Sequence, residues 1–509
     1  MAHANAVELL LGPAALARHG ERTALICGKE QITFAELAAS VRRASGALAS
    51  FGVLPGDRVL ILMRDTPEFA AAWLGAVHLG AVAVALNSKL GEAEYRHIVS
   101  DSRARFAVVE DVFAAARPDL TEELARDGKI AIAGQRVGFL PDWRERLSSS
   151  AEAPPFSASG DDTPAFMLYS SGTTGLPKGM LHSHRSLSSA GAACRAFGLG
   201  ENDRILATSK MFFAYGLEHA LVAPLALGAT SILSPDWPTA QSVCELVARH
   251  RPSAVFSVPT MYRRIVAEMP GPLDQFQGVR RCVAAGEHPS VQLAEQWRAA
   301  TGHELLNLYG MSETFCACMV TPPGSADGLR TGLPLDGVEV RLESGDAPDS
   351  PAVLWLRHPA QTRRYENRPA ETAAQFRGGW FCTRDVFALD AEGYYVYQGR
   401  SDDLIKIAGQ WVRPAELEGA VAALAEVAEA ACVAVPDADG LERLALFIAA
   451  RPGARGALDA AAAACAQALP GHKRPKWLRV VEQLPRTATG KVQRFKLREL
   501  LTAELSGRR

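Results

Sequence analysis

The chain has 509 residues, of which 48% are apolar and 22% are charged, and its formal net charge is −2. A chain of this length exceeds what one hydrophobic core usually supports, so we expect at least two domains. The balanced charge gives no reason to expect a nucleic acid or an anionic membrane as partner. No run of some twenty apolar residues predicts a membrane span, and no basic segment precedes the first apolar stretch, which argues against a secretory signal.

Apolar strands alternate with longer helical patterns through most of the chain. We predict strands at residues 58–63, 81–86, 106–110, 253–258, 279–285 and 304–308, and helices at 67–79, 241–250, 260–269 and 290–301. This alternation predicts α/β layers with largely parallel sheets. Residues 151–164 are rich in Pro, Ser, Gly and Asp and predict a surface connection.

The pattern changes near Gly399, where a short strand at 394–397 is followed by a polar stretch that ends at Asp403. Beyond it we expect a compact α+β arrangement, with helices at 415–427, 458–469 and 495–505 and strands at 430–435 and 444–449. Pro414 stands where the first of these helices should begin. We therefore predict a large N-terminal α/β domain at 1–401 and a small C-terminal domain at 402–509.

The nine cysteines are scattered, and the one close pair is Cys316 and Cys318. No second pair completes a disulfide framework or a cysteine metal site. Reduced thiols in a cytoplasmic protein fit this distribution.

A loop rich in glycine and hydroxyl groups follows the apolar run that starts at Pro164. Residues 169–179 read Tyr-Ser-Ser-Gly-Thr-Thr-Gly-Leu-Pro-Lys-Gly. Glycines let a backbone approach a ligand closely, and amides, hydroxyls and a lysine can hold phosphate oxygens. The spacing differs from that of the Walker loop, so the stretch predicts a nucleotide phosphate site of another type.

Four further stretches make the prediction of a nucleotide site more specific. Residues 307–314 offer an aromatic ring for a purine, a hydroxyl for a phosphate and a carboxylate for magnesium. Asp385, at an expected loop after Trp380, can accept both ribose hydroxyls, and Arg400 and Asp402 stand at the predicted domain boundary. Residues 485–491 form a turn-rich loop that carries Lys491.

Together these five motifs resemble those of the adenylate-forming superfamily of acyl-CoA synthetases, non-ribosomal adenylation domains and luciferases, in the family's order and over nearly the whole chain. The resemblance implies that the small domain is mobile and swings about Asp402 between two half-reactions. Lys491 is implied to drive adenylation, Ser312 to contact the α-phosphate, and Glu313 to bind Mg2+. The other implied contacts to ATP and coenzyme A are Ser170, Ser171, Gly172, Thr173, Thr174, Gly175, Lys178, Gly286, Glu287, Asn307, Tyr309, Asp385, Arg400 and, beside the pantetheine arm, Gly409.

One position departs from the family pattern. The family usually has glycine where this chain has Arg384, next to Asp385. The large side chain either points outward or disturbs the ribose contact.

Residues 210–217, Lys-Met-Phe-Phe-Ala-Tyr-Gly-Leu, are similar to the corresponding stretch of benzoate- and aminobenzoate-CoA ligases. This resemblance implies a pocket for a short, flat aromatic acid. Its implied lining is Phe213, Ala214, Tyr215, Ala284, Ala285, Gly310, Met311 and Cys316. The aromatic residues can equally be core residues, and His219, which stands where smaller residues are common, is either a substrate contact or a histidine on a helix surface.

The leading hypothesis is an ATP-dependent ligase that joins an aromatic acid to coenzyme A through an acyl-AMP intermediate and releases AMP and pyrophosphate. The alternatives are an adenylation protein that loads a carrier protein, a ligase for another short or cyclic acid, a luciferase-like oxygenase and a non-catalytic nucleotide-binding protein. The family includes homodimers, and no residue of this chain decides the oligomeric state.

Overall fold

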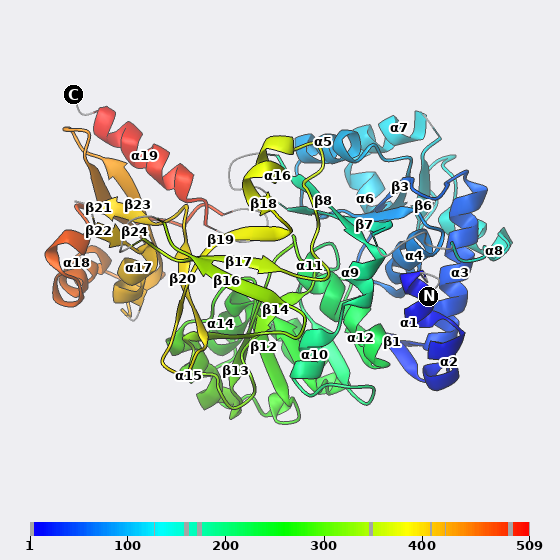
Figure 1. The fold of residues 1–509 in the computed structure, drawn as a ribbon, viewed down its shortest axis with the longest axis horizontal. Coiled ribbons are helices and arrows are strands. Elements are labelled where there is room, and N and C mark those ends of the chain that lie inside the picture. Colours follow the sequence, from blue (N-terminus) through cyan, green and yellow to red (C-terminus); the bar gives the residue numbers. More distant parts are fainter. Residues whose placement is uncertain are drawn as a thin grey trace. The chain divides into compact units, whose positions relative to one another are not determined.

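The computed structural model describes residues 5–126, 128–156, 162–170, 176–345, 350–407, 410–422, 424–486 and 492–507 (Figure 1). The chain divides into two compact units. The first comprises Met1–Gly172, Leu176–Val340 and Leu356–Phe381, and the second Thr173–Gly175, Arg341–Trp355 and Cys382–Arg509. The second unit therefore includes residues on both sides of Asp402, and the domain boundary placed there stays a prediction.

The first unit contains a large sheet whose middle strands are parallel. Its strands lie in the order β15 (Arg330–Pro334), β14 (Ala317–Val320), β13 (Leu305–Gly310), β12 (Arg281–Ala285), β11 (Ala254–Ser257), β9 (Arg204–Ala207), β10 (Thr230–Leu233), β1 (Thr23–Cys27) and β2 (Glu30–Thr33). The pairs from β13 to β1 are parallel, while β14 and β2 run antiparallel to their neighbours β13 and β1. Ala284 faces Asn307 across β12 and β13. The inner strands are short continuous apolar runs, as expected of strands buried on both faces.

Helices follow the parallel strands where the sequence predicts them. They are α13 (Ala240–His250), α14 (Pro259–Glu268) and α15 (Val291–Thr301), and Ser290 caps α15 by accepting a hydrogen bond from the Leu293 amide. Trp297 of α15 is fully buried against Tyr262 of α14, with ring centroids 4.7 Å apart. These elements confirm the predicted alternation of strands and helices.

A second sheet in the first unit has the order β6 (Ile130–Ala133), β5 (Phe106–Glu110), β3 (Arg58–Leu62), β4 (Val82–Ala85), β7 (Pro164–Ser170) and β8 (Lys178–Ser183). Only the pair β7–β8 is antiparallel. Helices α3 (Phe34–Ser50), α4 (Pro67–His78) and α8 (Trp143–Ser149) lie side by side (Figure 1). Gly75 allows this packing, since an added Cβ there would lie 2.6 Å from the Cβ of Ala44.

The remaining helices of the first unit are short. They are α1 (Ala6–Leu11), α2 (Pro13–His19), α5 (Glu92–Ser102), α6 (Asp111–Ala116), α7 (Pro118–Arg126), α9 (His184–Ser188), α10 (Ala192–Ala196), α11 (Ala214–Leu217), the π-helix η1 (Glu218–Val222), α12 (Ala223–Leu227), the 3-10 helix η2 (Asp274–Phe276) and α16 (Pro369–Gln375). Among the residues described, no helix is long and apolar enough to cross a membrane.

The second unit holds a three-stranded sheet of β23 (Val427–Pro436), β24 (Glu442–Ala450) and β25 (Trp477–Val481) with α17 (Pro414–Ala422), α18 (Ala457–Ala468) and α19 (Arg494–Ser506). Strands β21 (Ile405–Ile407) and β22 (Gln410–Val412) form a hairpin. The helix predicted at 415–427 is shorter than expected, and this part of the prediction is wrong. It ends at Ala422 because Val427 already pairs with Ala450 as the first residue of β23.

Candidate active site

The carboxyl ends of β9, β11, β12 and β13 meet at one edge of the large sheet, because neighbouring strands among them are parallel. Ligands of open α/β sheets bind at this kind of edge. Each of the three segments predicted to line the acyl pocket begins or ends at this edge of the sheet. Phe213, Ala214 and Tyr215 come after β9, Ala284 and Ala285 end β12, Gly310 ends β13, and Met311 and Cys316 lie in the turn before β14.

The segment that leads into α11 is held from both sides. The Nζ of Lys210 donates to the carbonyl oxygen of Ser234 at 2.7 Å and lies 3.7 Å from the Oδ2 of Asp65. The Phe213 amide donates to the Lys210 carbonyl at 2.9 Å. Gly216 packs so closely that a Cβ there would lie 2.1 Å from the same carbonyl oxygen. The residues after Lys210 are thus fixed before any ligand binds.

The aromatic residues of this segment have different environments. Phe212 is 6% exposed and belongs to the core, as the alternative interpretation expected, with its ring 4.5 Å from that of Phe213. Phe213 and Tyr215 are half-buried. The Tyr215 hydroxyl lies 3.3 Å from the carbonyl oxygens of both Ser257 and Val283, which fixes the ring against β11 and β12.

The turn between β13 and β14 carries Ser312 and Glu313, both half-buried. The carbonyl of Ser312 lies 2.9 Å from the Nε2 of His182, and the carbonyl of Glu313 accepts from the Thr362 amide at 2.8 Å. Burial lowers the pKa of His182 to about 4, so this ring is neutral at pH 7. The two contacts fix the turn from strand β8 and from the segment before α16.

Tyr365 links the predicted phosphate lysine to the predicted magnesium ligand. Its hydroxyl donates to the Oε1 of Glu313 at 2.7 Å, and the Nζ of Lys178 lies 5.4 Å from its ring centroid. Lys178 begins β8 opposite Ser170, the last residue of β7, and forms an ion pair with Glu371 of α16. Tyr365, Glu371 and His182 could not be predicted from the sequence, since no spacing connects them to the motifs.

The candidate ribose residues lie together in the second unit. Asp385 and Arg400 face each other on the paired strands β19 (Trp380–Leu389) and β20 (Tyr395–Arg400), with Arg400 Nη1 3.3 Å from Asp385 Oδ1. The prediction that Asp385 lies in a loop is wrong. It is inside β19 and 7% exposed, because the strand continues through Leu389 to pair with β20.

Arg384 occupies a backbone conformation that favours glycine, with φ of 59°. Its half-exposed side chain reaches Asp402, with Nη1 3.2 Å from Oδ2, and the same oxygen lies 3.9 Å from Nη2 of Arg400. Arg384 is thus joined through Asp402 to the Arg400 side chain that faces Asp385. Asp402 itself is exposed.

The other predicted residues are placed as follows. Gly286, with φ of 85°, and Glu287 are exposed just after β12. Asn307 is buried and Tyr309 half-buried, both within β13. Ser171, Gly172, Thr173, Thr174, Gly175, Gly409 and Lys491 lie outside the described residues.

Two charged or ionisable groups at the acyl-pocket segment are fully enclosed. Glu218 is 2% exposed and His219 is not exposed. The interpretation of His219 as a helix-surface histidine is therefore wrong, since the π-helix turns it into the interior. Burial raises the pKa of Glu218 to about 8, so its carboxyl is mostly protonated at pH 7.

Glu313 is the carboxylate that the site offers to a metal ion. In the part of the chain that the structure describes, no group of three or more His, Cys, Asp or Glu side chains is placed to hold a metal. Magnesium is commonly bound by one or two carboxylates together with the phosphates of a substrate. A half-buried carboxylate such as that of Glu313 would suit Mg2+ carried by a nucleotide.

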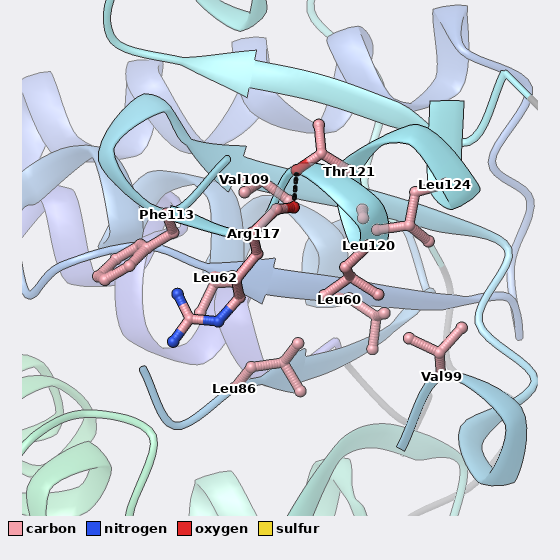
Figure 2. Close-up of a pocket in the computed structure, with 11 residues that line it drawn as sticks. Leu60, Leu62, Leu86, Val99, Val109, Phe113, Arg117, Leu120, Thr121 and Leu124 are labelled. Atoms are coloured by element: carbon pink, nitrogen blue, oxygen red, sulfur yellow. Dashed lines mark hydrogen bonds between the residues drawn. The ribbon is translucent and has the colours of Figure 1, made fainter. Parts of the chain in front are cut away.

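Of two recesses in the first unit, one lies apart from these residues and the other borders Tyr365. One, of about 10 Å³, is enclosed by apolar side chains such as Leu60, Val109 and Leu120 between the second sheet and α7 (Figure 2). Its volume is that of about one water molecule, so it is a packing gap. The other, of about 600 Å³, is polar and includes Arg58, Asp101 and Arg368. Neither is lined by a predicted site residue.

Comparison with known proteins identifies the family. Residues 13–366 match the AMP-binding enzyme family, and residues 416–491 match the AMP-binding enzyme C-terminal domain. The chain belongs to this family, which confirms the predicted adenylate-forming class and its fold, with a large N-terminal and a small C-terminal domain.

Relatives match the whole chain. A 3-hydroxybenzoate–CoA ligase of Aromatoleum sp. (strain CIB) is 39% identical, over 98% of this chain and 97% of its own length. A 3-hydroxybenzoate–CoA/4-hydroxybenzoate–CoA ligase of Thauera aromatica is 38% identical, over 98% of both chains. The crystal structure of an anthranilate CoA ligase in complex with anthranoyl-AMP is 29% identical, with a TM-score of 0.91 over 99% of both chains. The names of these relatives support the prediction of an AMP-forming acid–thiol ligase.

Proposed function

We propose that this protein is an ATP-dependent ligase that joins an aromatic, benzoate-type acid to coenzyme A. The observation that carries the proposal is the meeting of three predicted pocket walls at the carboxyl edge of the sheet, with Phe213 and Tyr215 half-buried there. A flat ring fits such aromatic walls. Relatives that act on benzoate-type acids and match over the full length support the same substrate class.

The reaction has two steps. A carboxylate oxygen of the acid attacks the α-phosphorus of ATP, which forms acyl-AMP and expels pyrophosphate. The thiolate of coenzyme A then attacks the acyl carbonyl carbon, the carbon–oxygen bond to AMP breaks, and the thiol proton goes to solvent. The protein contributes mainly position and charge to steps of this kind.

The roles of individual residues are also proposals. Tyr309 stacks on the purine, Ser312 holds the α-phosphate, and Asp385 with Arg400 holds the ribose. Lys491 supplies a compact positive charge between the carboxylate and the phosphate. Mg2+, held by Glu313, would neutralise phosphate charge. Tyr365 orients that carboxylate through its 2.7 Å hydrogen bond.

The test is pyrophosphate release with ATP and magnesium across benzoate, hydroxy- and aminobenzoates, cinnamate-type acids and fatty acids, with and without coenzyme A. We expect release with benzoate-type acids and formation of aryl-CoA only when coenzyme A is present. Activity on fatty acids alone would reject the aromatic pocket. Formation of acyl-AMP without transfer to coenzyme A would instead indicate a carrier protein as acceptor.

A cytoplasmic location and a homodimer are further proposals. No disulfide joins the cysteines that the structure describes, which supports a reducing compartment. The mass of the purified protein in solution tests the dimer.

A further inference from the structure

The helix at the acyl pocket changes its winding where two ionisable residues occur. After α11, the amide of Ala223 donates to the carbonyl of Glu218, five residues earlier, and residues 218–222 form the π-helix η1. Such single wide turns are frequent at functional sites. Glu218 and His219 begin this turn and are both enclosed by protein.

His219 offers an acceptor that no described residue uses. Its Nδ1 lies 3.1 Å from the carbonyl oxygen of Tyr215, and a carbonyl can only accept, so Nδ1 carries the proton. Burial lowers the pKa of His219 to about 4, which leaves the ring neutral at pH 7. Nε2 is therefore an acceptor, and it is buried without a hydrogen-bond partner among the described residues. Such a group is costly to leave unpaired.

The position of His219 connects two predicted walls of the acyl pocket. Its ring centroid lies 4.9 Å from that of Tyr215 and 4.3 Å from that of Phe256 in β11. Its Nδ1 is 3.7 Å from the Oε2 of Glu218, which accepts a hydrogen bond from the Ala317 amide at 3.2 Å. Ala317 directly follows Cys316, which belongs to the predicted wall between β13 and β14. The pair Glu218–His219 thus lies against Tyr215 on one side and, through Glu218, against the residue that follows Cys316 on the other.

We propose that Nε2 of His219 accepts a hydrogen bond from a hydroxyl group on the aromatic ring of the acid. The proposal rests on the proposed function and specifies its substrate as a hydroxylated benzoate-type acid. A hydroxyl would satisfy the buried acceptor, whereas an unsubstituted ring or a methyl group would leave it unpaired. A site built around such a bond rejects analogues that lack the donor.

The first test needs no variant. Pyrophosphate release is measured with benzoate, the three monohydroxybenzoates and the three methylbenzoates. We expect kcat/KM for one hydroxybenzoate to exceed that for benzoate, and for the methyl acid substituted at the same position, by about 10- to 100-fold. Equal values for the hydroxyl and methyl acids would overturn the proposal while leaving an aromatic-acid ligase in place. No release with any aromatic acid would reject the proposed function itself.

The second test uses variants of the enzyme. His219→Leu should lower kcat/KM for the hydroxybenzoate by a larger factor than that for benzoate, so that the preference is lost, whereas His219→Gln keeps an acceptor and should retain part of the preference. The matched control is His184→Leu. His184 is also a buried histidine with an unpartnered Nε2, but its Nδ1 accepts from the Ala6 amide, away from the pocket. An equal loss with both acids in His219→Leu would overturn the proposal. If that variant does not fold, the His219→Gln variant and the substrate series decide.

Discussion

Glu218 is a carboxyl group that the fold removes from water. Its pKa is raised to about 8 by burial, and hydrogen bonds from the Ala317 amide, the Cys316 side chain and the Gly191 amide only partly offset this shift. The folded protein therefore keeps a proton that the unfolded chain releases near the ordinary glutamate pKa of 4.5. The stability that this group contributes is fully present below pH 4.5 and is lost as the pH rises to about 8.

Glu218→Gln removes this dependence, because an amide stays neutral. We expect the stability of the variant relative to the wild type to rise with pH between 5 and 8, by up to about 1.4 kcal/mol per pH unit. Urea unfolding of both proteins across this range measures the difference. Glu295→Gln, at an exposed position of α15, is the control. Parallel curves for the Glu218 variant and the wild type would show that the carboxyl is not held protonated.

Arg384 combines a strained backbone with an exposed ion pair. Its φ of 59° favours glycine, and its ion pair with Asp402 is solvent-exposed on both sides. Arg384→Gly should relieve the strain and lose the pair, whereas Arg384→Ala loses the pair and keeps the strain. We expect the glycine variant to be more stable than the alanine variant by about 1 kcal/mol, measured by thermal unfolding. An alanine variant as stable as the glycine variant would contradict the strain argument.

At the scale of elements, helix α11 packs closely against the segment that precedes it, and this packing requires glycine at position 216. A Cβ at Gly216 would lie 2.1 Å from the Lys210 carbonyl oxygen and 2.5 Å from that of Ser209. Gly216→Ala must therefore move α11 or the segment before it. We expect a loss of stability of about 1–3 kcal/mol and a larger rise in KM for the acid than for ATP.

The matched control for this substitution is Gly200→Ala. An added Cβ at Gly200 meets nothing within 4 Å, and its backbone is not left-handed. Stability and KM should stay at wild-type values there. A Gly216→Ala variant that behaves like this control would show that the pocket segment has room to relax.

At the scale of the whole molecule, several buried histidines make the first unit sensitive to acid. Burial lowers the pKa of His182, His184, His219 and His358 to about 4 in each case. The folded state binds fewer protons than the unfolded chain, whose histidines titrate near their ordinary pKa of 6.5. The stability that depends on these neutral rings is present above pH 6.5 and is lost as the pH falls to about 4.

We expect the thermal midpoint to fall between pH 7 and pH 5, with up to about 1.4 kcal/mol per pH unit from each histidine. His184→Leu should reduce the dependence of stability on pH by the contribution of one histidine, up to about 1.4 kcal/mol per pH unit, because leucine does not titrate. A midpoint that does not change over this range would contradict the burial of these rings as neutral groups.

The two half-reactions give a second prediction for the whole molecule. If the small domain alternates, Lys491 acts in the first step and leaves before the second. Lys491→Ala should reduce acyl-AMP formation by at least about 100-fold and leave thioester formation from supplied acyl-AMP within a few-fold of wild type. Equal losses in both half-reactions would reject the role given to Lys491. Lys496→Ala, in α19, is a control for the loss of a lysine from the same domain.

The sequence alone determined the elements and the class of chemistry. Short apolar runs such as Phe106–Glu110 are local signals, and that strand begins and ends where the sequence predicts. The five motifs identified the adenylate-forming family because their order is itself sequence information. The structure also gathers the predicted pocket walls at one sheet edge, since parallel neighbours end together.

The tertiary structure decided burial and the partners of each side chain. The contact between His182 and Ser312 joins positions 130 residues apart, and that between Tyr365 and Glu313 joins positions 52 apart. The end of α17, the strand position of Asp385 and the enclosure of His219 all depend on which distant segment packs against them. Local sequence patterns carry no information about such neighbours, whereas the loss of water around a group, which sets its pKa and the cost of leaving it unpaired, depends on all of them.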